Sequence, residues 1–335
     1  MTTLPLRPLG RTDIAITRIG FGAWAAGGSD WAYGWGGQED AQSIATIRRA
    51  VDAGINWIDT AAVYGLGHSE EIVGKALADI PANDRPFVFT KAGFVGDEKN
   101  PHAEPAKIGN AASLRREVEA SLKRLGVERI DLCQMHWPAE DVGLEEYWST
   151  LLDLKKEGKI RAAGLSNHSV EQLEQAESLG TVDCVQPPFS ALRRSFAGAE
   201  LPWCVTHQTG VIVYSPMQSG LLSGRFSVER LASLPEGDWR KHNSFFRGDK
   251  LTKGLQLAES FKPIAERHNT SVAAVAIAWT LAFEGVTGAI VGARTPAQID
   301  GFLPAATLNL TKADLEEIAT TIHRLQIGRG PAKPQ

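Results

Sequence analysis

The chain has 335 residues and a formal net charge of -4, with 43% hydrophobic and 22% charged residues. This mild acidity argues against a protein that holds nucleic acid on a basic face. The most apolar stretch, residues 272–283, is too short to cross a bilayer and predicts a buried helix instead. The first residues contain no apolar signal-peptide region, so the cytoplasm is the expected compartment.

The first predicted element is a β-hairpin over residues 6–16, which we expect to close one end of the fold. Short apolar runs follow it, and most are continuously apolar rather than alternating, which is typical of parallel strands covered on both faces. These runs span residues 18–21, 56–59, 87–90, 130–135, 162–165, 183–186, 210–213 and 288–291.

Segments with helical spacing separate the runs. Leu114, Val118 and Leu122 recur at helical intervals after Ser113, the expected N-cap. Eight alternating strand and helix patterns predict an α/β fold, a single (β/α)8 TIM barrel over residues 1–335. Two longer segments interrupt the alternation. The first excursion is residues 22–39, and the second excursion is residues 220–253; we expect both as extended loops at the C-terminal face.

Polar side chains stand at the end of almost every predicted strand. In chain order they are Asp59, Lys91, His136, Ser166 and Asn167, Gln186, and Tyr214 and Ser215, with Tyr64 in the loop after Asp59. Taken singly, Asp59 is also a common helix cap, Lys91 a common surface lysine and His136 a common core histidine. The C-terminal strand ends of a barrel converge on one face, so together these residues predict an active site there.

Tyr64 and its neighbours have the residue types that proton transfer to a carbonyl group needs. A tyrosine hydroxyl has a pKa near 10, and we expect the Lys91 ammonium to lower the pKa of Tyr64. Asp59 is the expected ion-pair partner of Lys91, and His136 is the expected hydrogen-bond donor to the carbonyl oxygen. The histidines have no paired metal-ligand spacing, so no metal is expected.

Five segments together resemble the aldo-keto reductase superfamily, in particular its bacterial NADPH-dependent branch. GINWIDTAAVYGLGHSEEIVG at residues 54–74 and KKEGKIRAAGLSN at residues 155–167 are similar to the two signatures of that superfamily. VQPPFS around Gln186, YSPMQSGLLSGR from Tyr214 and IVGARTPAQ from Ile290 are similar to its cofactor-binding segments. The resemblance covers nearly the whole chain in the right order.

The resemblance implies reduction of an aldehyde or ketone by hydride from NADPH, with Tyr64 as the acid and Asp59, Lys91 and His136 assisting it. It assigns Ser166, Asn167 and Gln186 to the carboxamide of the nicotinamide, and Phe189 to the stacking face beneath the ring. The resemblance places Ser215, Gly220, Leu221 and Arg225 along the pyrophosphate, under the second excursion, and Arg294 and Gln298 at the adenosine 2′-phosphate. Tyr214 and Gly292 complete the implied cofactor contacts. Gly301 and Phe302 replace a Glu and an Asn of many relatives, which leaves the adenine contacts open.

Aromatic residues are the candidates for the substrate pocket. Trp24 and Trp137 follow strands and are expected to border the carbonyl site, whereas Trp31, Tyr33 and Trp35 either line the pocket or pack the first excursion onto the rim. The expected partner is a small carbonyl compound. Two other functions stay open: a cofactor-binding regulatory subunit, and a lyase that forms a Schiff base on Lys91. The physiological substrate, the favoured direction and the oligomeric state are not predicted.

Overall fold

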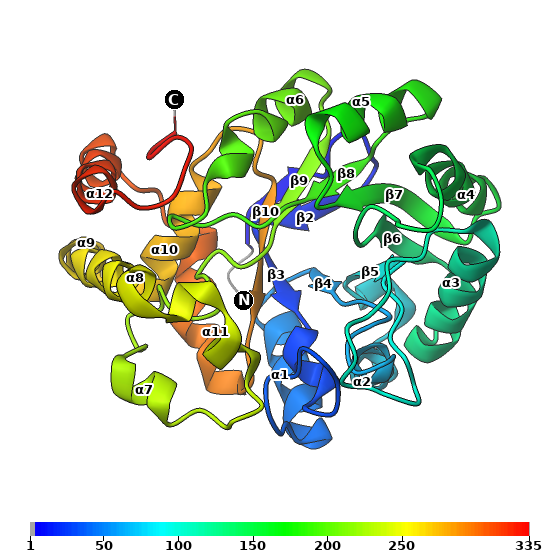
Figure 1. Ribbon diagram of the computed structural model, residues 1–335, viewed down its shortest axis with the longest axis horizontal. Helices are drawn as coiled ribbons and strands as arrows, with labels where there is room; N and C mark the ends of the chain where they lie inside the picture. The colour runs from blue at the N-terminus through cyan, green and yellow to red at the C-terminus, as the bar shows by residue number, and fades with distance from the viewer. Residues whose placement is uncertain (1–3, 335) are drawn as a thin grey trace.

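The structure, a computed structural model that describes residues 4–334, has a closed barrel of parallel strands at its centre (Figure 1). The barrel strands are β3 (Ile19–Gly22), β4 (Trp57–Asp59), β5 (Phe87–Ala92), β6 (Ile130–Met135), β7 (Ile160–Ser166), β8 (Cys184–Gln186), β9 (Gly210–Val213) and β10 (Gly288–Gly292). They pair in sequence order, and β10 closes the ring against β3. The predicted TIM barrel is therefore confirmed.

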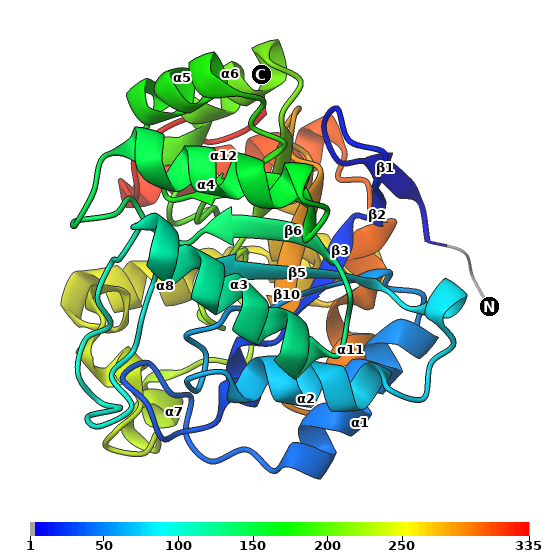
Figure 2. The same ribbon diagram turned by 90° about the vertical axis from the view of Figure 1, so that its right-hand side faces the viewer.

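The predicted hairpin is also present, as the antiparallel strands β1 (Leu6–Pro8) and β2 (Ala15–Thr17). Its apolar residues Leu9, Ile14 and Ile16 are buried in one cluster with inward-facing barrel residues such as Trp57 and Phe89. The Trp57 indole N–H donates to the Thr17 carbonyl oxygen at 2.8 Å. Figure 2 shows the hairpin at one end of the barrel and α7 toward the other end. The hairpin thus closes the end opposite the C-terminal strand ends.

Helices surround the strands in Figure 1. The α-helices are α1 (Asp40–Asp52), α2 (His68–Leu77), α3 (Ala111–Leu125), α4 (Leu144–Lys156), α5 (Val170–Leu179), α6 (Glu200–Thr206), α7 (Val228–Ala232), α8 (Gly248–Ser260), α9 (Lys262–Arg267), α10 (Val272–Leu281), α11 (Pro296–Phe302) and α12 (Lys312–Leu325). Short 3-10 helices are η1 (Trp24–Gly27), η2 (Ala82–Asp84), η3 (Ser195–Ala197), η4 (Trp239–His242), η5 (Ser244–Phe246) and η6 (Leu303–Ala306).

Two sequence predictions about helices can be compared with these bounds. The apolar stretch at 272–283 forms α10, whose residues from Ala274 to Leu281 are all buried, as predicted. The predicted N-cap of α3 was wrong: Asn110, not Ser113, caps the helix, and its side chain accepts from the Ser113 backbone N–H. Asn and Ser both favour the N-cap position. Asn110 takes that position because its backbone is extended, whereas Ser113 already lies within the helix. Within residues 4–334, none of the helices has the combined length and apolar character that a membrane crossing needs.

Buried carboxylates on two neighbouring helices hold β5, the strand that carries Lys91. The fully buried Glu70 of α2 accepts from the Thr90 hydroxyl at 2.5 Å and pairs with Arg124 of α3 at 2.7 Å. Glu117 of α3 accepts from the Gly93 backbone N–H at 3.0 Å, just beyond the end of β5. The residues on both sides of Lys91 are therefore anchored to the helix layer, which limits how far the strand end can move.

Replacing Glu117 with glutamine is expected to stabilise the protein at alkaline pH. Burial raises the pKa of Glu117 from 4.5 to about 7, so the folded protein loses stability as the pH rises between these values. The full penalty, present above pH 7, has an upper limit of about 3 kcal/mol. The free energies of unfolding of E117Q and of the parent protein, measured with urea, should differ most at pH 8 and least at pH 5. The same substitution at the exposed Glu98 is the control, and an equal gain there would contradict the argument.

Candidate active site

The deepest part of the candidate site is a buried ion pair between Lys91 and Asp59 at the C-terminal strand ends. Lys91 Nζ donates to Asp59 Oδ1 at 2.6 Å and to the Thr60 carbonyl oxygen at 2.9 Å. The two side chains are only 1% and 4% exposed. Gln186 Nε2 donates to the other Asp59 oxygen at 2.8 Å. Burial raises the pKa of Asp59, and the Lys91 ammonium opposes that shift.

Tyr64 lies beside this pair, but the sign of its predicted pKa shift was wrong. Lys91 Nζ is 3.5 Å from the Tyr64 hydroxyl and 5.2 Å from the centre of its ring. Burial and the Asp59 carboxylate raise the pKa of Tyr64 well above its usual range. The negative partner offsets the ammonium, so desolvation decides the direction. Tyr64 therefore holds its proton at neutral pH, which suits a proton donor.

His136 completes the group of candidate proton-transfer residues. Its ring meets the Tyr64 ring edge to face, with centroids 5.8 Å apart. Burial and the nearby Lys91 ammonium lower the pKa of His136 well below its usual range, so the imidazole is neutral. Its Nδ1 is buried without a hydrogen-bond partner among the described residues. The structure thus brings Asp59, Tyr64, Lys91 and His136, hereafter the candidate tetrad, into one cluster.

The residues assigned to the carboxamide form a hydrogen-bonded network next to the tetrad. The Ser166 hydroxyl donates to the Gln186 carbonyl oxygen at 2.8 Å. Asn167, which has a left-handed backbone, donates to the His136 carbonyl oxygen at 3.0 Å. Its side-chain oxygen accepts from the Tyr214 hydroxyl at 2.8 Å. This network ties β7, β8 and β9 together at the mouth and links the candidate cofactor residues to the backbone of His136.

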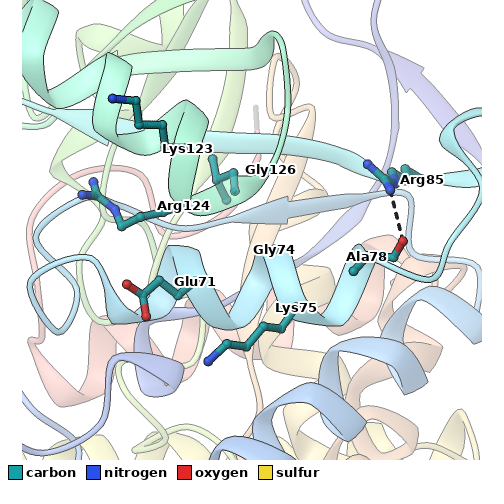
Figure 3. Close-up of a pocket in the computed structure, with 9 residues that line it drawn as sticks. Glu71, Gly74, Lys75, Ala78, Arg85, Lys123, Arg124 and Gly126 are labelled. Carbon is teal, nitrogen blue, oxygen red and sulfur yellow. Dashed lines mark hydrogen bonds between the residues drawn. The ribbon is translucent and has the colours of Figure 1, made fainter.

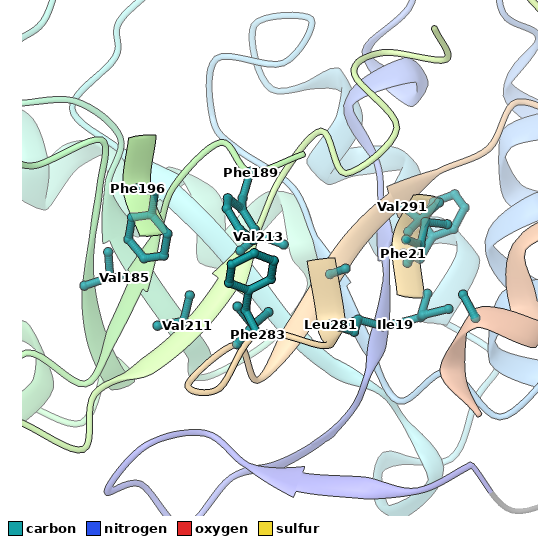
Figure 4. Packing of buried hydrophobic residues seen from close by; sticks show 14 of the residues in the cluster. Ile19, Phe21, Val185, Phe189, Phe196, Val211, Val213, Leu281, Phe283 and Val291 are labelled. Atoms are coloured by element: carbon teal, nitrogen blue, oxygen red, sulfur yellow. The ribbon is translucent and has the colours of Figure 1, made fainter. Parts of the chain in front are cut away.

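Phe189 cannot offer a stacking face, contrary to the expectation from the resemblance. Its side chain is 0% exposed, and Figure 4 shows it among other buried residues, including Phe196 and Phe283. The ring centre of Phe189 lies 4.9 Å from that of Phe283 and 5.5 Å from that of Trp279. This apolar packing leaves no part of the Phe189 ring exposed to a ligand. Tyr214, just after β9, is a half-buried aromatic residue at the mouth.

The loop after β9 has a strained backbone. Ser215, Gln218 and Ser219 all have positive φ angles, between 48° and 55°, and Gly220 follows with φ 94°. Non-glycine residues in this region cost energy and collect at functional sites. The Ser190 hydroxyl, which donates to Gln218 Oε1 at 3.0 Å, helps to hold the loop. Consecutive backbone N–H groups in such loops suit an anion.

Two other residues assigned to this loop differ in exposure. The Leu221 side chain is fully buried, so only its backbone is left to face a ligand. The Arg225 side chain is exposed on the second excursion.

Arg294 does not present a free guanidinium fork. Its Nε donates to Gln38 Oε1 at 2.8 Å, and its terminal nitrogens donate to the carbonyl oxygens of Trp35 and Gly37. Gln298 Oε1 accepts from the Arg294 backbone N–H at 2.6 Å. The first excursion therefore binds the guanidinium group that the family resemblance assigned to the 2′-phosphate.

Near Arg294, the other residues of the adenosine end differ in burial. Gly292 ends β10 and is exposed, as is Gln298. Phe302 is buried and Gly301 is partly buried, so the adenine contacts stay open.

The aromatic residues of the first excursion gather over Tyr64. Trp24 lies nearly parallel to the Tyr64 ring, with centroids 6.0 Å apart and an angle of 22°. Its indole N–H donates to the Tyr33 carbonyl oxygen at 3.1 Å. Close backbone contact enforces this position, because a β-carbon at Gly65 would collide with the Gly27 carbonyl oxygen. Trp31 is 3% exposed and also contacts Tyr64, at 5.8 Å.

The remaining aromatic neighbours come from other loops. Trp137 contacts Phe94, with their ring centres 6.4 Å apart, and Phe94 belongs to the same apolar cluster as Trp31. Trp239 of the second excursion stacks on Trp24, a contact that the sequence prediction missed. The second excursion has no periodic pattern, so the only signal in the sequence for a role of Trp239 at the site was that it is a tryptophan.

Two surface pockets lie away from this cluster. One, of about 600 Å³, is lined by basic residues of α2 and α3 such as Lys75, Lys123 and Arg124 (Figure 3). The Arg85 guanidinium beside it donates to the Ala78 carbonyl oxygen at 3.3 Å. The other, of about 580 Å³, lies near β1 and the end of α10. No residue of the candidate tetrad lines either pocket, so the candidate active site remains the group at the barrel mouth.

Comparisons with known proteins point to one family. A model described as the aldo/keto reductase family matches residues 18–322. The chain is 35% identical over 312 residues to aldo-keto reductase YhdN of Bacillus subtilis, covering 93% of this chain and 91% of that protein. It is 34% identical over 332 residues to the NADH-specific methylglyoxal reductase of Escherichia coli, covering 95% of this chain and 99% of that protein.

A solved structure agrees with these comparisons. The glycerol dehydrogenase AKR11B4 from Gluconobacter oxydans superposes with a TM-score of 0.86 at 36% sequence identity. The superposition covers 100% of this chain and 99% of that protein.

Proposed function

The chain belongs to the aldo/keto reductase family, and from this premise we propose that it is an oxidoreductase that reduces a small aldehyde or ketone with a nicotinamide dinucleotide. The observation that carries the proposal is the buried Lys91–Asp59 pair with the protonated Tyr64 hydroxyl beside it. Such a group at the C-terminal strand ends of a barrel is where catalysis is expected.

The residues at the mouth divide the work of reduction. Tyr64 supplies the proton to the carbonyl oxygen, because its raised pKa keeps the hydroxyl protonated at neutral pH. The neutral imidazole of His136 donates a hydrogen bond that orients the same oxygen. Lys91 and Asp59 keep the phenol in place and stabilise charge that develops on it. A nicotinamide dinucleotide held by the mouth residues would supply the hydride for the carbonyl carbon.

The residues present fit a dinucleotide that extends across the mouth. The half-buried Tyr214 ring is the candidate face for the nicotinamide, in place of Phe189. Ser166, Asn167 and Gln186 offer polar groups to the carboxamide, and the strained loop from Ser215 to Gly220 suits the pyrophosphate. In this proposal the second excursion covers the cofactor.

The lyase alternative is not favoured by this geometry. A Schiff base requires a neutral amine, whereas Lys91 donates to the Asp59 carboxylate in a buried ion pair. The test of the proposed function is a panel of short aliphatic aldehydes, hydroxyaldehydes and aromatic aldehydes, assayed for oxidation of NADPH and of NADH. Turnover of at least one aldehyde class is expected. Tight cofactor binding without turnover on the whole panel would indicate a regulatory subunit instead.

NADPH is the cofactor that we propose, with Arg294 as the residue that meets the 2′-phosphate after release from Gln38 and from the carbonyl oxygens of Trp35 and Gly37. Replacing Arg294 with alanine is expected to raise the dissociation constant for NADPH by about 10- to 100-fold, and that for NADH much less. Titration of intrinsic tryptophan fluorescence measures both constants. Equal losses, or tighter binding of NADH by the parent protein, would contradict the assignment; one relative is named as NADH-specific.

A further inference from the structure

The two excursions meet over the candidate tetrad through three tryptophans. Trp239 stacks on Trp24, with ring centres 5.4 Å apart and an angle of 24°. Trp35 meets both rings edge to face, at 5.2 Å from Trp24 and 5.6 Å from Trp239. Trp24 and Trp35 belong to the first excursion and Trp239 to the second, so these rings, hereafter the tryptophan clasp, join segments that are far apart in the sequence.

A buried ion pair on either side of Trp239 in the sequence helps to fix the clasp. Arg240 donates to both oxygens of Asp238, at 2.9 and 2.6 Å, and both side chains are nearly buried. The Arg240 guanidinium also lies 4.7 Å from the ring centre of Trp35. A guanidinium that is paired and stacked in this way loses much of its freedom, so the backbone around Trp239 is held in place.

Trp24 is the member of the clasp that covers Tyr64, the proposed proton donor. Trp24 lies nearly parallel to Tyr64 on one side of the stack and carries Trp239 as a second neighbour. Its indole N–H is already used by the Tyr33 carbonyl oxygen. A carbonyl compound that reaches the Tyr64 hydroxyl must therefore fit beside Trp24. A bulky substituent has to displace that ring, and well-packed aromatic groups resist displacement.

We propose that Trp239 is a specificity-determining positioning residue that holds Trp24 against Tyr64 and so restricts the site to carbonyl compounds with small substituents. The inference rests on the proposed reductase function. Trp239 acts through Trp24 rather than on the reacting atoms. Its loss would widen the site for bulky substrates without removing any group that transfers a proton.

The test compares glyceraldehyde with cyclohexanecarboxaldehyde as substrates, at saturating cofactor, by the ratio of their kcat/KM values. The parent protein is expected to favour glyceraldehyde. W239A is expected to shift the ratio toward the bulky aldehyde by about 10- to 100-fold, mainly through a lower KM for that substrate. W239F keeps an aromatic ring on Trp24 and is expected to retain most of the discrimination.

Trp203 of α6, which is buried away from the clasp against His207, is the matched control. W203A is expected to leave the ratio unchanged, since general destabilisation lowers turnover of both aldehydes together. W35L loosens the same clasp from the first excursion, and it is expected to shift the ratio in the same direction even if W239A does not fold.

The outcomes separate the two proposals. An unchanged ratio in folded W239A, or an equal shift in W203A, would overturn the role of Trp239 while leaving the reductase function intact. A parent protein that reduces neither these aldehydes nor any other on the panel would overturn the proposed function itself.

Discussion

Replacing Tyr64 with phenylalanine is expected to lower kcat for carbonyl reduction by about 10²- to 10⁴-fold, the range that a general acid contributes. The substitution removes the only side-chain hydroxyl that is hydrogen-bonded to Lys91 or Asp59 among the described contacts, and it keeps the ring that Trp24 covers. Cofactor affinity, read by tryptophan fluorescence, is expected to stay near the parent value. Steady-state consumption of the reduced cofactor with an accepted aldehyde measures the loss.

Tyr33 is the matched control for this substitution. It belongs to the first excursion, and its hydroxyl donates to the exposed Glu104 at 3.0 Å rather than approaching Lys91. Y33F is therefore expected to keep most of the activity. Turnover retained in Y64F, or a loss of equal size in Y33F, would remove Tyr64 from the role of acid.

The pH dependence of reduction follows from the same residue. Burial and Asp59 raise the pKa of Tyr64 well above its usual range, so the donor form persists through neutral and mildly alkaline pH. The low pKa of His136 keeps the imidazole neutral over the same range. The reverse reaction, alcohol oxidation, needs the deprotonated phenol and is expected to be favoured only at higher pH.

Replacing Lys91 with methionine is expected to destabilise the fold as well as abolish activity. Methionine has no charge, and the Asp59 carboxylate, 4% exposed, then keeps Gln186 as its remaining side-chain donor among the described contacts. Removing one partner of a buried ion pair costs about 3–5 kcal/mol. Urea unfolding and the aldehyde assay measure the two effects separately.

A double variant separates the structural effect from the catalytic one. K91M/D59N removes both charges, so most of the lost stability is expected to return while activity stays absent. The deficit of K91M alone is expected to shrink as the pH falls, because protonation of Asp59 relieves the buried charge. A K91M variant as stable as the parent protein at pH 8 would show that the pair is better solvated than its burial indicates.

The barrel and the tetrad were predictable because both depend on local sequence. Continuously apolar runs predict covered parallel strands, and the residues at the end of each run lie at the mouth once the barrel closes. The sequence therefore predicts that Asp59, Lys91 and His136 lie at the mouth, and the structure brings them together there with Tyr64. The sign of the Tyr64 pKa shift was not predictable in this way, because it depends on how completely the surrounding loops exclude water.

The contacts of the two excursions could not be predicted from the sequence either. The bonds between Arg294 and Gln38 and the stacking of Trp239 on Trp24 join segments without periodic patterning, so only tertiary packing determines them. Phe189 and Tyr214 are both aromatic residues near strand ends. Their roles differ because Trp279 and Phe283 cover Phe189, whereas Tyr214 stays half-buried at the mouth.

Transfer of deuterium from reduced cofactor that carries deuterium at both C4 positions of the nicotinamide ring tests the central claim most directly. After incubation of the parent protein with the labelled, reduced cofactor and an accepted aldehyde, mass spectrometry or NMR of the product reports where the label resides. The account predicts an alcohol that carries deuterium on the former carbonyl carbon, formed by the parent protein and not by Y64F. An alcohol without the label, or a product still covalently bound to Lys91, would contradict it.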